Sequence, residues 1–233
     1  MNINKKKIVF LVSGNGGNLH FIYEAIKRRY LKNHQIINVV ADRHCGAIDI
    51  AVKKKIAYKI IDFKDKGQIA LHKHLIKLEP DLIVTSIHKI IDTKIIKTFE
   101  KKLINLHYSL LPSFGGLIGM IPVQHALKEG CSKLGVTSHY AEKEVDMGKH
   151  IAQISFSSGR YTFFSDDLAN LIFRCGCLCL LAAINKQQCI SNDFKPVSID
   201  VLSEKCLLTG AHLPCELSKI TEDFWEIIQN KAA

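Results

Sequence analysis

Short apolar runs alternate with amphipathic stretches through the first part of the chain, and this alternation constrains the fold more than any other feature. Five runs predict buried strands, at residues 8–12, 36–41, 58–61, 81–86 and 103–106. The stretches between them have helical spacing at residues 18–29, 48–55 and 68–78. Strands separated by helices pair in parallel, because the chain must cross over between them. The sequence therefore predicts an α/β fold, a Rossmann-like, mostly parallel sheet with helices on both faces.

The pattern changes after Pro112. A glycine-rich loop at residues 114–119 precedes a helix near 123–128, a strand pair at 134–140 and 151–157, and a long apolar helix at 168–184. The last part of the chain mixes short apolar runs with turn residues and yields no ordered prediction. We expect a catalytic domain over residues 1–185 and a C-terminal extension over 186–233.

Positive charge is concentrated in the first part of the chain. The formal net charge is +10, yet the segment from Arg160 onward has seven basic and nine acidic residues, so residues 1–159 carry +12. A basic portion suits an anionic ligand such as a phosphate, a nucleotide or a nucleic acid, and a solvated lysine-rich surface is the alternative. No apolar run is long enough for a membrane span and no export signal is recognisable, so we expect a cytoplasmic protein.

Eight cysteines are expected to be free thiols in a reducing compartment. Cys175, Cys177 and Cys179 lie close together in the sequence, but no Cys-x-x-Cys pair or matching histidine pair accompanies them. Cysteine packs as a small apolar residue, so these three are interpreted as core residues and no metal site is predicted.

A polar, glycine-rich segment follows the first predicted strand and leads into a helix. Its residues are Ser13, Gly14, Asn15, Gly16, Gly17 and Asn18. Glycines expose backbone N–H groups, and a helix N-terminus adds partial positive charge, so the segment could cradle a phosphate. A purely structural tight turn, with Asn18 capping the helix, is the alternative.

Two further places in the sequence could carry chemistry. Asn105 and His107 lie at the carboxyl end of the fifth predicted strand, where open parallel sheets bind ligands, and an i, i+2 pair on a strand points the same way. Asn105 could donate to an oxyanion and His107 could move a proton, although such a pair can also be structural. Asp146 would favour an imidazolium at His107 and orient its ring, or would simply form a turn before Gly148.

Taken in order, these motifs resemble the folate-dependent formyltransferase family. The segment Asn105-x-His107-x-Ser109-Leu110-Leu111-Pro112 matches its catalytic signature, and Val145-Asp146-x-Gly148, with Ile151 and Gln153, matches its second signature. The likeness covers about residues 7 to 185. It implies transfer of a formyl group from N10-formyltetrahydrofolate to a primary amine, with no metal. It also implies a small phosphorylated amine as substrate and no nucleic-acid or membrane partner, and a homodimer is left open.

Under this resemblance the site residues fall into three sets. Asn105, His107 and Asp146 would be catalytic, the first two stabilising the oxyanion and Asp146 holding His107. The folate would bind Ile87, His88, Lys89, Ile90, Ile91, His139, Glu142 and Val145. The acceptor would bind residues 13–18 together with Tyr108, Ser109, Phe114, Gly115 and Gly116.

The departures from the signature bear on the acceptor. Tyr108 stands where purine-pathway members carry proline, and residues 114–119 are similar to those of formyltransferases acting on nucleotide-linked amino sugars. We therefore expect a nucleotide-linked amino sugar, such as a dTDP-4-amino-4,6-dideoxyhexose of surface polysaccharide biosynthesis. Phosphoribosylglycinamide formyltransferase of purine biosynthesis is the alternative. A formyltetrahydrofolate hydrolase and a catalytically silent phosphate-binding protein are the remaining hypotheses.

Overall fold

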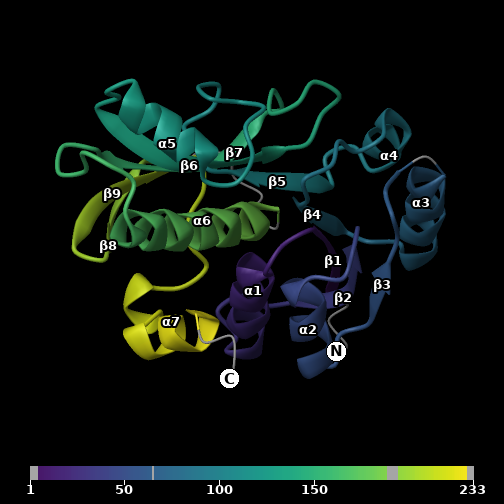
Figure 1. Cartoon of the computed structure of the whole chain (residues 1–233). Coiled ribbons are helices and arrows are strands. Elements are labelled where there is room, and N and C mark those ends of the chain that lie inside the picture. The colour runs from purple at the N-terminus through teal and green to yellow at the C-terminus, as the bar shows by residue number, and fades with distance from the viewer. Residues whose placement is uncertain (1–4, 65, 188–193, 230–233) are drawn as a thin grey trace. The chain divides into compact units, whose positions relative to one another are not determined.

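A computed structural model of the protein describes residues 5–64, 66–187 and 194–229, and the chain divides into two compact units (Figure 1). The first unit comprises Met1–Asn105 and Ser218–Ala233, and the second comprises Leu106–Leu217. The C-terminal part beyond residue 185 is thus shared between the two units. The predicted boundary of the catalytic domain at residue 185 stays a prediction.

Parallel strands form the centre of the first unit, in the order β3-β2-β1-β4-β5. They are β1 (Lys6–Val12), β2 (His34–Ala41), β3 (Tyr58–Ile60), β4 (Leu82–Ser86) and β5 (Leu103–His107), and the last two residues of β5 belong to the second unit. The helices are α1 (Gly17–Lys27), α2 (Gly46–Lys53), α3 (Gly67–Leu78), α4 (Thr93–Thr98) and, from the C-terminal end, α7 (Glu222–Gln229). The five strands lie where the apolar runs predict them.

The second unit is antiparallel, with strand order β6-β7-β9-β8. Its strands are β6 (Lys133–Tyr140), β7 (His150–Ser157), β8 (Val197–Val201) and β9 (Glu204–Thr209). Its helices are α5 (Ile121–Lys128) and α6 (Asp166–Lys186), and the 3-10 helix Leu217–Lys219 spans the boundary between the units. The mostly parallel α/β fold is confirmed, and the sequence missed α4, β8, β9 and α7.

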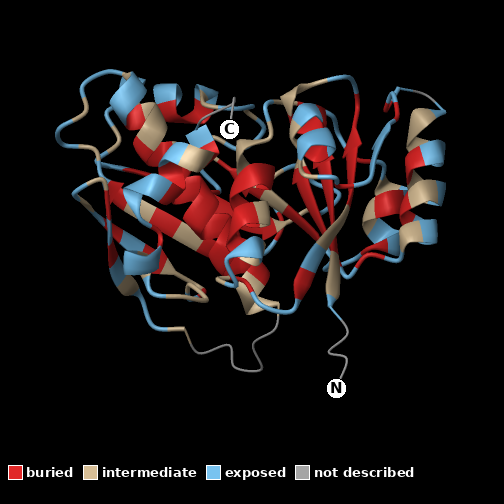
Figure 2. Cartoon of the chain, turned by 90° about the horizontal axis from the view of Figure 1, so that it is seen from below, coloured by how far each residue is buried: buried red, intermediate tan, exposed pale blue. Residues whose placement is uncertain are grey.

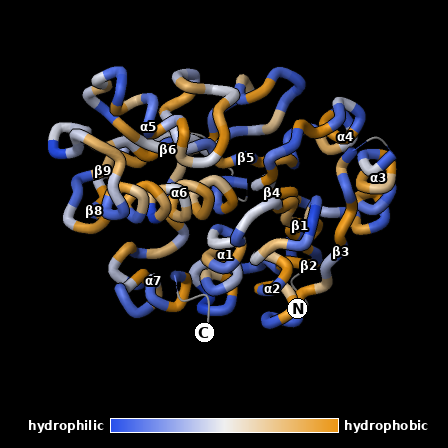
Figure 3. Tube along the Cα trace, viewed as in Figure 1, coloured by the Kyte–Doolittle hydropathy of each residue, from blue (hydrophilic) through white to orange (hydrophobic). Residues whose placement is uncertain are grey.

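Buried residues run along β1, β2 and β4 of the first unit and along α6 of the second (Figure 2). Strand β3 is exposed. Helix α6 is apolar over nearly its whole length (Figure 3), and within the described residues it is the helix long and apolar enough to cross a membrane. It packs on β6 and β7, however, and 78% of its apolar window is buried in the protein. Such burial is typical of a core helix.

The cysteines of α6 lie in this core. Cys175, Cys177 and Cys179 are fully buried, and burial raises the pKa of the Cys179 thiol to about 11. Cys175 Sγ lies 3.9 Å from Cys206 Sγ of β9 without a disulfide. The interpretation of these residues as core is confirmed, whereas Cys189 lies outside the described residues.

Candidate active site

The glycine-rich segment forms the connection from β1 to α1. Gly16 has φ of 76°, and a Cβ there would lie 2.7 Å from Ala47 Cα, so only glycine fits. Helix α1 begins at Gly17, so its N-cap residue is Gly16. The alternative in which Asn18 caps the helix is therefore wrong about the cap. The N–H groups of Gly14, Asn15 and Gly16 donate no hydrogen bond to any described residue. These donors are therefore available to an anion.

Ser13, in contrast, is fully engaged inside the first unit. Its N–H donates to Ser86 O at 3.1 Å, and its Oγ accepts from His88 N at 3.1 Å. Its hydroxyl also hydrogen-bonds to the carboxylate of Asp42. Burial alone would raise the pKa of Asp42, but the bonds from Arg43 and Ser13 outweigh it and hold the pKa below its ordinary value. The side chain of Ser13 thus joins the glycine-rich segment to the loop after β4.

Asn105 is oriented by a threonine that the sequence did not single out. Thr85 on β4 stands opposite Asn105 in the parallel register, and its hydroxyl lies 3.1 Å from Asn105 Oδ1. The same hydroxyl lies 3.2 Å from Ile104 O and has one hydrogen, so it donates to one of the two oxygens at a time. When it donates to Asn105 Oδ1, the NH₂ group of the amide points the other way. The sequence could have indicated this contact in only one way, since Thr85 and Asn105 both lie near the carboxyl ends of their predicted strands.

His107 and Asp146 meet in the second unit. His107 Nδ1 lies 3.3 Å from Asp146 Oδ2, and both side chains are buried. Burial tends to raise the pKa of Asp146, but hydrogen bonds from His139 and the Gly116 N–H, together with the charge of His107, lower it below its ordinary value. Asp146 is therefore ionised at neutral pH. The predicted pairing of His107 with Asp146 is present in the structure.

A second histidine contacts the same carboxylate. His139 on β6 is buried, and its Nε2 lies 3.4 Å from Asp146 Oδ1 while its Nδ1 lies 2.8 Å from Tyr140 O. Asp146 itself has φ of 56°, a left-handed conformation that aspartate tolerates better than most residues. Asp146 thus bridges His107 and His139.

The loop after β5 fixes the other nitrogen of His107. His107 Nε2 lies 3.0 Å from Phe114 O, and Phe114 has φ of 59°. A carbonyl oxygen only accepts, so His107 needs a hydrogen on Nε2 for this contact and on Nδ1 for the contact with Asp146. The ring makes both contacts fully only as an imidazolium. Gly116 N also donates to Asp146 Oδ2, at 2.8 Å.

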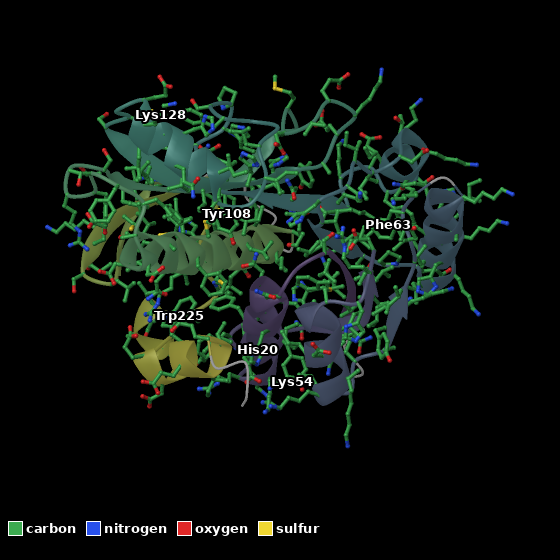
Figure 4. All side chains as sticks on the ribbon, in the orientation of Figure 1. His20, Lys54, Phe63, Tyr108, Lys128 and Trp225 are labelled. Carbon is green, nitrogen blue, oxygen red and sulfur yellow. The ribbon has the colours of Figure 1, made fainter. Side chains whose placement is uncertain are left out.

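Tyr108 turns into the second unit. Tyr108 is labelled beside α6 in Figure 4. A Cβ on Gly176 of this helix would lie 2.8 Å from Tyr108 Cε1, so the ring packs on this glycine. Tyr108 also lines a cavity of about 90 Å³ beneath α5, together with Phe114 and Val123. The departure from the proline signature is accommodated by internal packing.

The remaining predicted residues occupy three loops. Ile87, His88, Lys89, Ile90 and Ile91 follow β4 in the first unit, whereas Glu142 and Val145 lie in the β6–β7 turn of the second. Ser109 Oγ donates to Ser113 O and so braces its own loop. Thr137, another residue the sequence did not single out, donates to Ser109 O and accepts from Leu111 N. Within the described ranges no group of three or more His, Cys, Asp or Glu side chains could hold a metal ion.

The family of the chain follows from comparison with known proteins. Residues 6–157 match the family model described as formyl transferase. The chain belongs to the formyltransferase family. Its resemblance to the folate-dependent formyltransferase family is confirmed.

The relatives indicate the kind of formyltransferase that the chain is similar to. A chloroplastic phosphoribosylglycinamide formyltransferase of Vigna unguiculata is 29% identical over 66% of this chain and 52% of its own length. The Mycobacterium tuberculosis enzyme of that name is 29% identical over 63% of this chain and 69% of its own length. The chain thus spans about half the length of its plant relative. A solved phosphoribosylglycinamide formyltransferase from Anaplasma phagocytophilum is 25% identical, with a TM-score of 0.69 over 82% of this chain and 97% of that one.

The prediction of a nucleotide-linked amino sugar as acceptor is wrong. Most of the matching relatives carry the name phosphoribosylglycinamide formyltransferase or belong to trifunctional purine biosynthetic proteins, which favours the purine alternative. The structure explains the error, because neither departure from the signature needs an acceptor to account for it. Tyr108 packs on Gly176, and Phe114 and Gly116 contact His107 and Asp146 through their backbones.

Proposed function

We propose that the protein transfers a formyl group from N10-formyltetrahydrofolate to the amino group of phosphoribosylglycinamide. The contact of His107 with an ionised Asp146, in a chain of this family, carries the proposal. The acceptor is supported by the names of the relatives.

Asn105 and His107 would stabilise the charge that develops during transfer. They lie two residues apart on β5, so their side chains leave the strand on the same side. Both would donate hydrogen bonds to the formyl oxygen as it gains negative charge, Asn105 through its NH₂ group and His107 as an imidazolium. Donors aimed at a developing oxyanion typically contribute factors of about 10² to 10³ to the rate.

His107 must first free one of its ring nitrogens. Nδ1 faces Asp146 and Nε2 faces the Phe114 carbonyl, so the chain itself occupies both. The carboxylate contact is charge-assisted and therefore the stronger of the two. We infer that Nε2 leaves Phe114 O and turns to the formyl oxygen when the substrates bind.

Asp146 would hold His107 and take up a proton. Its carboxylate keeps the imidazolium in place, and His139 and the Gly116 N–H hold the carboxylate. The attacking amine forms the new N–C bond and loses a proton, which Asp146 can accept through a water molecule and return to the departing nitrogen of the folate. The N–H groups of Gly14, Asn15 and Gly16 would bind the phosphate of the acceptor.

The test is an assay of the purified protein with N10-formyltetrahydrofolate and phosphoribosylglycinamide. Formation of tetrahydrofolate and of formylated product at equal rates is expected. His212→Asn is the matched control for His107→Asn, because His212 is an exposed histidine of the same unit. A wild-type protein that forms no product from this acceptor would contradict the proposal.

The predictions about location, partners and oligomeric state stay predictions. They are a cytoplasmic location, the absence of nucleic-acid and membrane partners, and a homodimer, which the sequence left open.

A further inference from the structure

The loop between β4 and α4, residues 87–92, holds five of the residues predicted to bind folate. Its first half is fixed by one side chain, since His88 N donates to Ser13 Oγ at 3.1 Å. Ser13 is buried and is itself held by Asp42. The beginning of segment 87–92 is therefore anchored to the interior of the first unit.

Gln68, the second residue of α3, fixes the other half. Its Nε2 donates to Ile90 O at 3.0 Å, and its Oε1 accepts from Asp92 N at 3.3 Å. One amide side chain thus satisfies an acceptor and a donor two residues apart, as the edge of a neighbouring strand would. Asp92 in turn caps α4, because its Oδ1 accepts from Lys94 N at 2.7 Å.

No other bond between described residues shapes the middle of the segment. The N–H groups of Lys89, Ile90 and Ile91 donate to no described residue, and the side chain of Ile90 is 75% exposed. Loops with few internal contacts open at low cost in free energy. The side chain of Ile91 is buried and packs in the first unit, so the amide of Gln68 matters most for the exposed residues Lys89 and Ile90.

We propose that Gln68 is a positioning residue for the folate-binding segment 87–92. It acts by keeping the peptide groups of residues 89–91 aligned for a planar heterocyclic ligand that has hydrogen-bond donors and acceptors along one edge. The inference rests on the proposed function and on the prediction, made from the family resemblance, that residues 87–91 bind the co-substrate. Gln68 lies outside the motifs that carry the family resemblance.

Two variants of α3 test the role of Gln68. Gln68→Ala removes both bonds to the loop, whereas Lys73→Ala removes an exposed side chain of the same helix and serves as the matched control. Two lost hydrogen bonds that hold a binding loop should weaken ligand binding about tenfold. We expect Gln68→Ala to raise the KM for N10-formyltetrahydrofolate by this factor and to leave both kcat and the KM for the acceptor within about twofold.

Two readouts do not depend on formyl transfer. Calorimetric titration with tetrahydrofolate should give a Kd about tenfold higher for Gln68→Ala than for the wild type and Lys73→Ala. Hydrogen exchange in the ligand-free protein should be faster at the Asp92 amide in Gln68→Ala, with exchange in β4 unchanged.

The outcomes separate this inference from the proposed function. A wild type that binds tetrahydrofolate but does not formylate phosphoribosylglycinamide would refute the function and leave the titration to decide the role of Gln68. An unchanged Kd in Gln68→Ala, an equal change in Lys73→Ala, a fall in kcat with unchanged KM, or a wild type that binds no folate would each overturn the inference.

Discussion

His107 and Asp146 are the residues on which the proposed chemistry depends most. Both side chains are buried, and the carboxylate of Asp146 contacts the imidazole rings of His107 and His139. Such a group can hold charge away from water, where hydrogen bonds to charged atoms are stronger.

Substitution of either residue should therefore affect turnover far more than acceptor binding. We expect His107→Asn and Asp146→Ala to lower kcat by about 10²-fold or more, because the first removes the cationic donor and the second its counter-charge. Steady-state kinetics gives kcat, and calorimetric titration with phosphoribosylglycinamide should give a nearly unchanged Kd. An equal loss of binding and turnover would show that these residues serve the structure.

Gly176 offers a second prediction at this scale. Because a Cβ there would meet Tyr108, Gly176→Val should overpack the second unit and lower the free energy of unfolding by about 1–3 kcal/mol. Urea denaturation gives this quantity. In a Tyr108→Pro background, Gly176→Val should lower the free energy of unfolding by less. The double-mutant cycle therefore measures the contact between the side chains at positions 108 and 176. Equal costs in both backgrounds would mean that the ring packs elsewhere.

At the scale of elements, α7 packs on α1. Phe21 of α1 stacks on Trp225 with ring centroids 5.1 Å apart and meets the edge of Phe224 at 5.4 Å. Arg28 lies over the Phe224 ring, 5.0 Å from its centroid. The C-terminal helix therefore supports the helix whose N-terminus carries the glycine-rich segment.

Loss of this aromatic contact should destabilise the first unit. Phe224→Ala should lower the free energy of unfolding by about 3–5 kcal/mol, because Phe224 is fully buried. Glu226→Ala, on the exposed side of the same helix, should change it by less than about 0.5 kcal/mol. Denaturant titration of both variants makes the comparison, and similar values for the two would show that α7 adds no stability.

The elements that the sequence could and could not predict differ in a physical way. Strands β1 and β4 are largely continuous apolar runs that are buried in the sheet, so composition alone reveals them. The hairpin of β8 and β9 turns through Leu202 and Ser203, both at positive φ. Such turns are normally signalled by Asn-Gly, and here that signal is missing.

The residues of the candidate site likewise divide into those that the sequence could predict and those that it could not. Asn105, His107 and Asp146 could be identified because they belong to contiguous motifs. Thr85 and Gln68 could not, since each acts through a hydrogen bond to a segment about twenty residues away in sequence. The conformation of Phe114, which directs its carbonyl to His107, was equally hidden, because bulky residues rarely adopt positive φ.

At the scale of the whole molecule, charge is divided between the two units. Met1–Asn105 with Ser218–Ala233 contain 23 basic and 12 acidic residues, whereas Leu106–Leu217 contain 9 and 10. The first unit thus carries +11 and the second −1. The positive unit is the one that holds the glycine-rich segment, which suits the anionic acceptor and folate of the proposed reaction.

Two buried histidines make stability depend on pH. Burial lowers the pKa of His20, followed by the charge of Lys54, and burial is also the main cause of the lowered pKa of His34. His20 on α1 and Lys54 after α2 are labelled in Figure 4. Each such histidine binds its proton more weakly in the folded protein than in the unfolded chain.

Stability should therefore fall as the pH decreases from 7 to 5. Below the unfolded pKa of about 6.5 the unfolded chain takes up protons that the folded protein does not, so each histidine contributes a slope of up to about 1.4 kcal/mol per pH unit. Asp42 and Asp146 have lowered pKa values and stay ionised throughout this range. Denaturant titration at several pH values measures the slope.

His20 allows this linkage to be tested at one position. The ring is buried, its Nε2 has no hydrogen-bond partner, and Glu24 Oε1 lies 3.9 Å away. His20→Gln cannot take up the proton, so its stability should fall less steeply with decreasing pH than that of the wild type. His212→Gln, an exchange at an exposed site, should retain the wild-type slope. If His20→Gln also retained it, the acid sensitivity would belong to other buried groups, and protonation of His20 would cost the folded protein nothing.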